Sequence, residues 1–349
     1  MPVFSASGFD GHEQVVFASD SATGLRAIIA LHDTRRGPAL GGCRCRDYPD
    51  EPAALTDALR LSRAMTFKAA MADLPYGGGK SVVLADPARK TPALMQALGR
   101  AVDRLGGRYI VAEDVGTSPR DMAEVRKETV HVAGLAEGGG DPSPATAFGV
   151  WRGIHAAVRR RLGRADLNGV RVAVQGLGHV GHHLCRHLHR EGARLFVADL
   201  RPAAVARAVA EFGAVPVAVD AIRAVEADVF APCALGAVID DEAVACLAAA
   251  VVAGAANNQL AAERYGEALA ARGILYAPDY VINAGGLINI HHERAPGGYD
   301  RAAAFAHVAR IEGTLAAVFD RAERDGVPPH LAADRMARER LAAPHTGGA

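Results

Sequence analysis

Lys80 ends a glycine-rich stretch, Leu74–Lys80, whose residue types could carry out acid–base chemistry. A second lysine, Lys68, lies twelve residues earlier, and Asp114 follows further along the chain. A lysine in a tight, partly dry site loses its proton more easily than a lysine in water, and a second ammonium nearby strengthens this effect. Glycines before Lys80 let a substrate approach the main chain closely. These residues therefore indicate a lysine that exchanges protons beside a cation and a carboxylate.

Two other interpretations of the glycine-rich stretch must be weighed. A phosphate-binding loop of the form GxxxxGK[ST] is excluded, because its first glycine would fall at position 74, which is Leu74. An ordinary glycine-rich turn with a solvated lysine stays open on this stretch alone. Whether the lysine exchanges protons or is only solvated, we expect the three glycines to form a turn between two elements.

The elements around this stretch predict an α/β domain over residues 1–135. Much of its first part has the apolar pattern of β-strands. Helical spacing of apolar residues then leads from a start at Asp50 to Lys68, and a later strand is expected to end just before Asp114. The two lysines, Lys68 and Lys80, and the carboxylate would then all lie at ends of elements, where sites are usually built.

Residues 146–286 predict a second domain, a doubly wound parallel sheet. A buried-strand pattern at 170–175 runs into a GxGxxG motif and a helix, and the next strand ends in Asp199. In that context the glycines Gly176, Gly178 and Gly181 are typical of a dinucleotide site, with the pyrophosphate at the helix N-terminus. Asp199 would accept hydrogen bonds from the adenosine ribose hydroxyls and repel a 2′-phosphate, which predicts NAD. Arg201 nearby leaves NADP open.

The remaining segments connect these two domains. The glycine- and proline-rich stretch Glu137–Pro144 is typical of a linker. One long helix over 302–323 and another near 330–341 follow the nucleotide-binding domain. We expect the helices of residues 287–349 to return to the first domain and pack back across the cleft.

Composition limits the classes of function. Lysine plus arginine and aspartate plus glutamate both number 39, so nothing favours nucleic acid. No signal peptide is visible, and no apolar run reaches the roughly 20 residues of a membrane helix. Five cysteines without a CxxC pair are most simply reduced thiols of a cytoplasmic protein.

Histidines are clustered at two places, but we expect no metal site. His179, His183 and His187 recur every four residues on one predicted helix, and His291 and His292 are adjacent. Two histidines at such a spacing can bind zinc, but no third ligand is placed by spacing. We interpret both clusters as solvated helix faces.

Together, the motifs make the sequence similar to the amino acid dehydrogenases for leucine, valine and phenylalanine, relatives of glutamate dehydrogenase. The resemblance covers nearly the whole chain. It is carried by Leu40–Gly42, Ala64–Lys68, Leu74–Lys80, Ala112–Thr117, Gln175–Gly181, Ala231–Ala234, Gly254–Asn258 and Tyr276–Gly286. It implies a homo-oligomer with an N-terminal substrate-binding and oligomerisation domain and a Rossmann-type NAD domain. The implied reaction converts an L-amino acid, water and NAD reversibly to a 2-oxo acid, ammonia and NADH.

The resemblance also implies roles for individual residues. Lys68 would bind the substrate carboxylate, Lys80 would be the general base that activates water, and Asp114 would transfer a proton at the amino group. Asn257 would contact the substrate amine or the nicotinamide ribose, and Thr146 the nicotinamide amide. The cofactor-binding set is Thr146, Gly176, Gly178, His179, Val180, Gly181, Asp199, Ala234 and Asn257.

By the same resemblance, the substrate side chain would meet apolar residues: Leu40, Met65, Ala112, Leu287 and Ile290, with Gly41 beside them. A carboxylate buried there without a partner would be costly, so glutamate is disfavoured. Ala112 resembles the leucine and valine enzymes, whereas Leu287 is found in some phenylalanine enzymes. We expect a branched-chain substrate (leucine, valine or isoleucine). An aromatic substrate such as phenylalanine, and a non-catalytic NAD-binding regulatory protein, are the alternatives.

Overall fold

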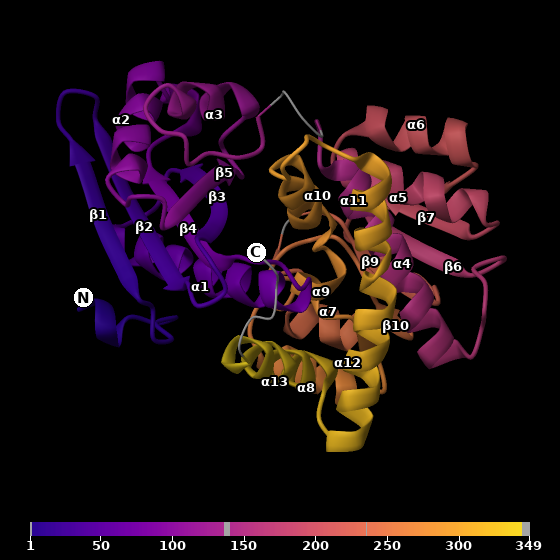
Figure 1. Cartoon of the computed structure of the whole chain (residues 1–349). Helices are drawn as coiled ribbons and strands as arrows, with labels where there is room; N and C mark the ends of the chain where they lie inside the picture. Colours follow the sequence, from indigo (N-terminus) through magenta and orange to yellow (C-terminus); the bar gives the residue numbers. More distant parts are fainter. Residues whose placement is uncertain (1, 136–139, 235, 344–349) are drawn as a thin grey trace. The chain divides into compact units, whose positions relative to one another are not determined.

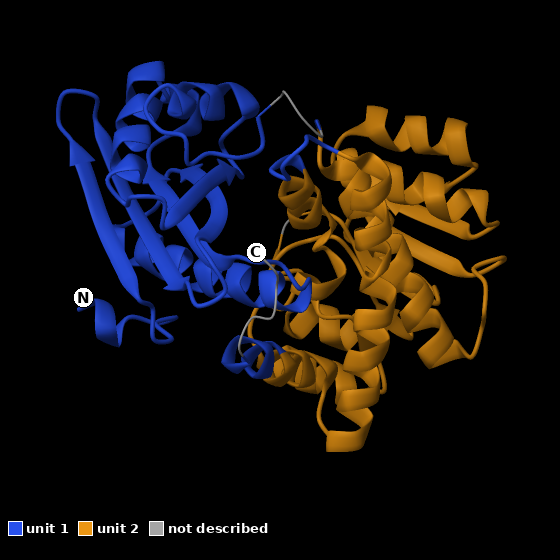
Figure 2. Ribbon diagram, in the orientation of Figure 1, with its two compact units in different colours: residues 1–140, 293–299, 337–349 blue, residues 141–292, 300–336 orange. Residues whose placement is uncertain are grey.

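The computed structural model describes residues 2–135, 140–234 and 236–343 of the chain, and it divides into two compact units (Figure 2). Unit 1 consists of Met1–Gly140, Glu293–Tyr299 and Ala337–Ala349, and unit 2 of Asp141–His292 and Asp300–Met336. Part of the predicted linker, residues 137–139, lies outside the described residues. Each unit contains its own β-sheet.

Unit 1 is a five-stranded sheet covered on both faces (Figure 1). Its strands run in the order β1-β2-β4-β3-β5, with β4 antiparallel to β2 and β3 parallel to both β4 and β5. One apolar cluster joins α1 to the sheet, and another joins α2 and α3 to the opposite face. The elements are β1 (Gln14–Asp20), β2 (Leu25–Asp33), β3 (Ala39–Arg46), α1 (Glu51–Met71), β4 (Gly77–Leu84), α2 (Pro92–Asp103), β5 (Tyr109–Glu113) and α3 (Pro119–Arg126).

Polar side chains cap the N-termini of helices α1, α2 and α3 in unit 1. Asp50, Thr91 and Ser118 each accept a hydrogen bond from a backbone N–H in the first turn of α1, α2 and α3. Such caps satisfy amides that have no partner inside the helix. A proline in the first turn of each helix reinforces the start. The helix start predicted at Asp50 is confirmed.

The prediction of a turn at the three glycines is wrong, because Gly77, Gly78 and Gly79 belong to strand β4. None of them has a positive φ, so the backbone does not need glycine for its conformation. Space is the reason instead. A Cβ on Gly77 would overlap the carbonyl oxygen of Asp33, and a Cβ on Gly79 would lie 2.7 Å from the ring of Tyr109.

Consequently Lys80 lies in the middle of β4 and not at the end of an element, as we had expected. Its backbone pairs with Ala30 of β2. A residue in a central strand is held on both sides by the ladder, so its side chain starts from a fixed point. Lys80 is thus held more rigidly than a loop residue would be.

Unit 2 confirms the predicted doubly wound sheet. Its six strands are all parallel and run in the order β11-β10-β9-β6-β7-β8, which is the 3-2-1-4-5-6 order of dinucleotide-binding folds. Helices α5 and α6 connect the first three strands, and α7 and α8 join a separate core cluster. The strands are β6 (Arg171–Gln175), β7 (Arg194–Ala198), β8 (Val215–Pro216), β9 (Val229–Pro232), β10 (Val251–Val252) and β11 (Leu275–Tyr276).

Helices make up most of the rest of unit 2. They are α4 (Ser143–Leu162), α5 (His179–Arg190), α6 (Pro202–Phe212), α7 (Asp241–Cys246), α8 (Arg264–Ala271), α9 (Asp279–Ile282), α10 (Gly285–Glu293), α11 (Arg301–Ala309), α12 (Ile311–Asp325) and α13 (Pro329–Ala342). Both α10 and α13 continue into unit 1. The single long helix predicted over 302–323 is two helices, which meet at Arg310. Short 3-10 helices lie at η1 (Val3–Ser5), η2 (Pro87–Arg89) and η3 (Ile222–Ala224).

One stretch, Arg301–Asp325, is long and apolar enough by length and composition to cross a membrane, with a mean hydropathy of 1.3. The sequence had indicated no such run. Its large apolar side chains, including Ile311, Leu315 and Phe319, are buried inside unit 2, and α12 packs against α4. Because only part of the stretch is buried, this is the pattern of amphipathic helices that pack one apolar face on a protein core.

All five cysteines are free thiols. Cys43 and Cys45 lie in β3 and belong to the core of unit 1, whereas Cys185 is buried in α5 of unit 2. Burial raises the pKa of the Cys43 thiol to about 12 and that of Cys45 to about 11. These thiols are therefore protonated and unreactive in the folded protein.

Candidate active site

Lys80 and Asp114 form a buried ion pair in unit 1. The ammonium Nζ of Lys80 lies 2.5 Å from Oδ2 of Asp114, and the side chains are 6% and 16% exposed. Asp114 follows the end of β5 directly, so parallel neighbouring strands bring it beside β4. Burial disfavours the ionised carboxylate, but Lys80 and the guanidinium of Arg44 outweigh burial and hold the pKa of Asp114 well below its usual range. The carboxylate therefore stays ionised beside the Lys80 side chain, away from bulk water.

Lys68 lies on α1, the helix that packs against β4. A Cβ on Gly78 of β4 would overlap the backbone nitrogen and Oγ1 of Thr66, two residues before Lys68. Only glycine at that position allows helix and strand to approach so closely. The Lys68 side chain is buried, at 9% exposure. The structure thus brings a second lysine, on the last turn of α1, next to the strand that carries Lys80.

Several of the predicted substrate-pocket residues lie on adjacent strands of unit 1. Leu40 on β3 pairs with Gly78 on one side and with Ile110 on the other, and Ala112 on β5 pairs with Gly42. Both Leu40 and Ala112 are buried. Gly41 could not be larger, since its Cβ would overlap the carbonyl oxygen of Gly79.

The other predicted pocket residues lie on helices. Met65 is on α1, half-buried, in the turn before Lys68. Leu287 and Ile290 are on α10 and belong to unit 2, where Leu287 is buried. All of these side chains are uncharged.

The GxGxxG loop of unit 2 fits a dinucleotide pyrophosphate. Gly176 has a φ of 97°, and a Cβ there would lie 2.8 Å from the backbone nitrogen of Ala234. A Cβ on Gly181 would overlap the carbonyl oxygen of Gly176, whereas a Cβ on Gly178 would meet nothing within 4 Å. Open space at Gly178, directly before α5, is what a phosphate group at the helix N-terminus requires. His179 and Val180 are the first two residues of α5.

Asp199, at the end of β7, is already hydrogen-bonded within the protein. Its Oδ2 accepts from the backbone N–H of Leu177 at 2.7 Å. Its Oδ1 accepts from the backbone N–H and Nε of Arg201 at 2.8 and 3.0 Å. Burial opposes ionisation, but these donors, led by Arg201, lower the pKa of the carboxyl. The carboxylate is therefore anchored beside the glycine-rich loop.

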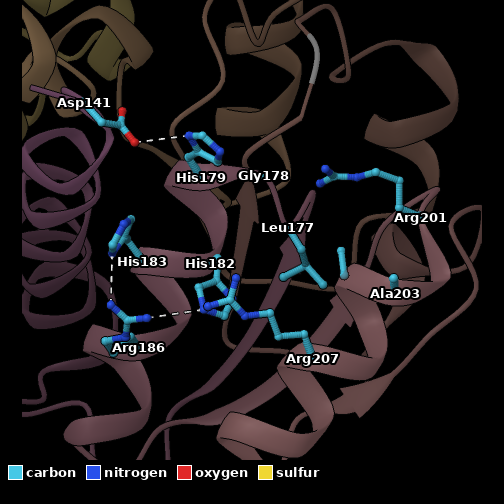
Figure 3. A pocket seen from close by; sticks show the side chains of 11 residues that line it. Asp141, Leu177, Gly178, His179, His182, His183, Arg186, Arg201, Ala203 and Arg207 are labelled. Carbon is cyan, nitrogen blue, oxygen red and sulfur yellow. Dashed lines mark hydrogen bonds and ion pairs between the residues drawn. The ribbon is translucent and has the colours of Figure 1, made fainter. Parts of the chain in front are cut away.

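A pocket of about 430 Å³ opens beside this loop (Figure 3). Three arginines contribute to its wall, and Asp141 is its carboxylate. Nearby Glu211 pairs with Arg207 at 2.6 Å and with His182 at 3.1 Å, which offsets part of the positive charge. The lining residues are Asp141, Leu177, Gly178, His179, His182, His183, Arg186, Arg201, Ala203, Ala204 and Arg207. A ligand with phosphate and ribose groups suits such a lining.

The loops after β9 and β10 lie side by side at the carboxyl edge of the sheet. A Cβ on Gly254 would overlap the carbonyl oxygen of Pro232. Asn283 donates its Nδ2 to the side chain of Asn257 at 2.9 Å and to the carbonyl of Ala255 at 3.1 Å. Parallel sheets of this kind bind ligands beyond the carboxyl ends of their strands. Asn257 and Ala234 thus share the edge with the glycine-rich loop.

Thr146 lies on the first turn of α4 and donates its hydroxyl to the carbonyl of Pro142 at 3.1 Å. A Cβ on Gly286 would lie 2.8 Å from its Oγ1. The start of α10 therefore packs tightly against the start of α4 within unit 2.

The histidines of α5 differ in their surroundings. Within the described residues, no group of three or more His, Cys, Asp or Glu side chains is arranged to hold a metal ion. The solvated-face interpretation is wrong for His187, whose ring stacks on Trp151 of α4 at 5.3 Å between centroids. Burial and nearby arginines lower the pKa of His187 to about 4. Helix α4 covers this face of α5, which the spacing could not indicate.

Comparison with known proteins identifies the family of the chain. Residues 12–131 match a model described as "Glu/Leu/Phe/Val dehydrogenase, dimerisation domain", and residues 201–345 match "Glutamate/Leucine/Phenylalanine/Valine dehydrogenase". The chain belongs to this family. The dehydrogenase is 51% identical to a leucine dehydrogenase from Bacillus cereus over 335 residues, which are 95% of this chain and 91% of that protein. The family assignment makes it an oxidoreductase that acts on amino acids.

Two further relatives act on different amino acids. An L-tryptophan dehydrogenase from Nostoc punctiforme is 48% identical over 332 residues, covering 95% of this chain and 94% of that protein. Its crystal structure superposes with a TM-score of 0.83 over 95% of this dehydrogenase and 96% of that chain. A valine dehydrogenase from Streptomyces albus is 48% identical over 339 residues, covering 95% and 93%.

Sequence reasoning gave no role to two residues that the structure brings into these sites. Arg44 contacts Asp114, and Asn283 holds Asn257. Arg44 was visible as the arginine after the glycine pair at positions 41 and 42, but its partner depends on how β3 and β5 pair. Asn283 lies 26 residues from Asn257, and nothing in the sequence links the two.

Proposed function

We propose that the chain catalyses the NAD-dependent, reversible oxidative deamination of an apolar L-amino acid, with branched-chain amino acids preferred. The observation that carries this proposal is the buried Lys80–Asp114 pair, with Lys68 on the helix that packs beside it. A general base and a fixed cation for a carboxylate are what the reaction needs. The products are the 2-oxo acid and ammonia.

Each residue of unit 1 has a separate task in this proposal. Lys68 binds the α-carboxylate of the substrate, which orients the α-carbon. Lys80 takes a proton from the water that attacks the imine carbon, and Asp114 exchanges a proton with the nitrogen that leaves as ammonia. Burial of the pair keeps bulk water from competing for these protons.

The dinucleotide is held by residues of unit 2. The loop from Gly176 to Gly181 takes the pyrophosphate, Asp199 takes the adenosine ribose, and Thr146, Ala234 and Asn257 lie on the side of the nicotinamide. NAD, when bound, accepts the hydride of the substrate α-carbon. Asp199 supports NAD over NADP, because its carboxylate repels a 2′-phosphate.

The substrate preference rests on uncharged pocket residues. Leu40, Ala112, Leu287 and Ile290 offer no partner for a charged side chain, which disfavours glutamate. The relatives named above act on leucine, valine and tryptophan, so an aromatic substrate is the second candidate. One methylene in a pocket is worth only about 1–3 kcal/mol, so discrimination among apolar amino acids is expected to be modest.

The proposal extends to the setting of the enzyme. Residues 1–135 would bind the substrate and join subunits into a homo-oligomer, in keeping with the match of 12–131 to a dimerisation domain. Residues 146–286 would bind NAD, and 287–349 would form the C-terminal helices. The free thiols support a reducing compartment such as the cytoplasm.

The test is the rate of NADH formation with purified protein, NAD and single L-amino acids. Leucine, valine, isoleucine, phenylalanine, tryptophan and glutamate form the panel. We expect the highest kcat/KM with a branched-chain member and the lowest with glutamate. A preference for phenylalanine or tryptophan would favour the second candidate, and an absence of NADH formation with every amino acid would contradict the proposal.

A further inference from the structure

Arg44 connects the Lys80–Asp114 pair to a second carboxylate. Its Nε lies 3.1 Å from Asp114 Oδ2, and its Nη1 lies 3.0 Å from Asp57 Oδ2. Tyr48 extends this series of contacts, because its hydroxyl donates a hydrogen bond to the same oxygen of Asp57 at 2.6 Å. The Arg44 side chain is only 16% exposed, so water screens these contacts weakly. Charges therefore alternate in sign from the lysine to Asp57.

The proposed reaction explains why a second cation beside Asp114 would be needed. Lys80 must be neutral when it takes a proton from water, and at that moment Asp114 loses its ammonium partner. A buried carboxylate without a counter-charge is costly. Arg44 stays protonated, so it still compensates the charge of Asp114. Arg44 and Lys80 thus share one carboxylate as their counter-charge.

We propose that Arg44 is a positioning residue, which acts through Asp114 to let Lys80 release its proton at the pH at which the enzyme works. The inference rests on the proposed function, because it takes Lys80 as the general base. Both cations bind Oδ2 of Asp114, so Arg44 also fixes the direction from which this carboxylate meets Lys80.

Three ionisable side chains beside these charged groups, Cys43, Tyr109 and Tyr48, stay neutral in the pH range of the test. Cys43 on β3 and Tyr109 on β5 both interact electrostatically with Asp114. Burial raises the pKa of the Cys43 thiol to about 12 and that of the Tyr109 phenol well above its usual range. Burial and the Asp57 carboxylate likewise raise the pKa of Tyr48 far above its usual value. Lys68, on the helix that packs against β4, and the substrate amine are common to the unmodified enzyme and its variants. A shift of the profile between variants therefore reports on the contacts that join Lys80, Asp114 and Arg44.

The experiment is the dependence of kcat/KM on pH for deamination of the best amino acid. In Arg44→Gln we expect the rising limb of the plot of kcat/KM against pH to shift by about one unit to higher pH. At pH 8, kcat/KM would then be about tenfold lower than in the unmodified enzyme, and the difference would shrink towards pH 10. Arg44→Lys keeps the charge and should restore most of the profile.

Two further variants make the test specific. Asp57→Asn removes the charge that offsets Arg44, so the limb should move to lower pH. Arg100→Gln is the matched control, because Arg100 also joins two carboxylates in unit 1, Asp20 at 3.1 Å and Glu128 at 3.4 Å. It should leave the profile unchanged.

Each outcome decides the inference. An equal loss of kcat/KM at every pH in Arg44→Gln would overturn it, because a purely structural contact does not move the limb. If Arg44→Gln does not fold, an unmoved limb in Asp57→Asn overturns it, and a downward shift in Asp57→Asn supports it. No turnover in the unmodified enzyme would overturn the proposed function and this inference together, whereas an active enzyme with unshifted variants would overturn this inference alone.

Discussion

At the scale of single residues, the Lys80–Asp114 pair is held by a strand on one side and a strand end on the other. Both groups have little access to water, so their charges interact far more strongly than a surface pair would. Removing one partner leaves the other buried and uncompensated. The pair is therefore sensitive to substitution both in chemistry and in stability.

Lys80→Ala should reduce kcat by at least about a hundredfold, since general acid–base catalysis contributes 10²–10⁴-fold. NAD binding, measured by titration calorimetry, should persist because the cofactor residues lie in unit 2. Lys90→Ala is a matched control: Lys90 also pairs with an aspartate, Asp121, at 2.5 Å in unit 1. The proposed role of Lys80 would be refuted by turnover close to that of the control.

Asp199→Ala should raise the use of NADP relative to NAD by about tenfold or more, measured as the ratio of kcat/KM values. The substitution removes the repelling carboxylate and also releases Arg201, which can then bind a 2′-phosphate. The double variant Asp199→Ala, Arg201→Ala should use NADP less well than the single variant. An unmodified enzyme that already uses both cofactors equally would show that this interpretation of Asp199 is mistaken.

The candidate site residues were proposed from motifs, because motifs fix which residue types occur at which spacing. Arg44 was not given a role, because its partner depends on register. Cys43 of β3 pairs with Glu113 of β5, and this pairing places the next residues, Arg44 and Asp114, side by side. A shift of one position would turn Arg44 to the other face of the sheet, and the sequence does not specify that choice.

At the scale of elements, close packing and not backbone conformation explains the three glycines of β4. Glycine-rich sequence predicted a turn, since glycine is common where φ is positive. Here the glycines allow β4 to pack closely against Asp33 of β2, against α1 and against Tyr109, and only the structure of these neighbours reveals it. By contrast, helix starts, strand patterns and the doubly wound sheet were predictable, because local capping residues and apolar runs determine them.

Substitutions in the glycine-rich loop before α5 can distinguish effects on stability from effects on NAD binding. Gly178→Ala should leave the melting temperature nearly unchanged, because its Cβ meets nothing within 4 Å, but should weaken NAD binding by tenfold or more. Gly181→Ala should lower the free energy of unfolding by about 1–3 kcal/mol or more, since its Cβ overlaps the Gly176 carbonyl. Thermal melts and NAD titrations measure both effects.

Gly313→Ala on α12 is the control for glycine substitution. Nothing lies within 4 Å of its Cβ, and alanine favours helices over glycine by up to about 1 kcal/mol. It should therefore stabilise the protein slightly and leave NAD binding intact. Equal NAD affinity in Gly178→Ala and Gly313→Ala would argue against a pyrophosphate at this loop.

At the scale of the whole molecule, buried histidines make stability depend on pH in both units. Burial and the neighbouring His12 lower the pKa of His32 to about 4, and His187 has a similar value. Unfolded histidines take up a proton near pH 6.5. Between about pH 6.5 and 4 the unfolded chain thus binds more protons, and the free energy of unfolding falls as the pH is lowered.

His32→Gln tests this prediction in unit 1. The His32 ring is hydrogen-bonded to Thr66 Oγ1 at 2.9 Å and to the Asp10 carbonyl at 3.1 Å, so the variant is expected to be less stable at every pH. Its stability should nevertheless fall less steeply than that of the unmodified protein between pH 6.5 and 4. Denaturant unfolding at several pH values gives the slopes, and parallel slopes would contradict the prediction.

The buried thiols have a practical consequence for following how the molecule opens. Cys43 and Cys45 become accessible only when the core of unit 1 comes apart, and Cys185 only when α5 leaves the sheet of unit 2. A brief pulse of an alkylating reagent would label each thiol in proportion to the time that its unit spends open. Mass spectrometry of the labelled peptides would then report the opening of each unit separately, without an introduced cysteine.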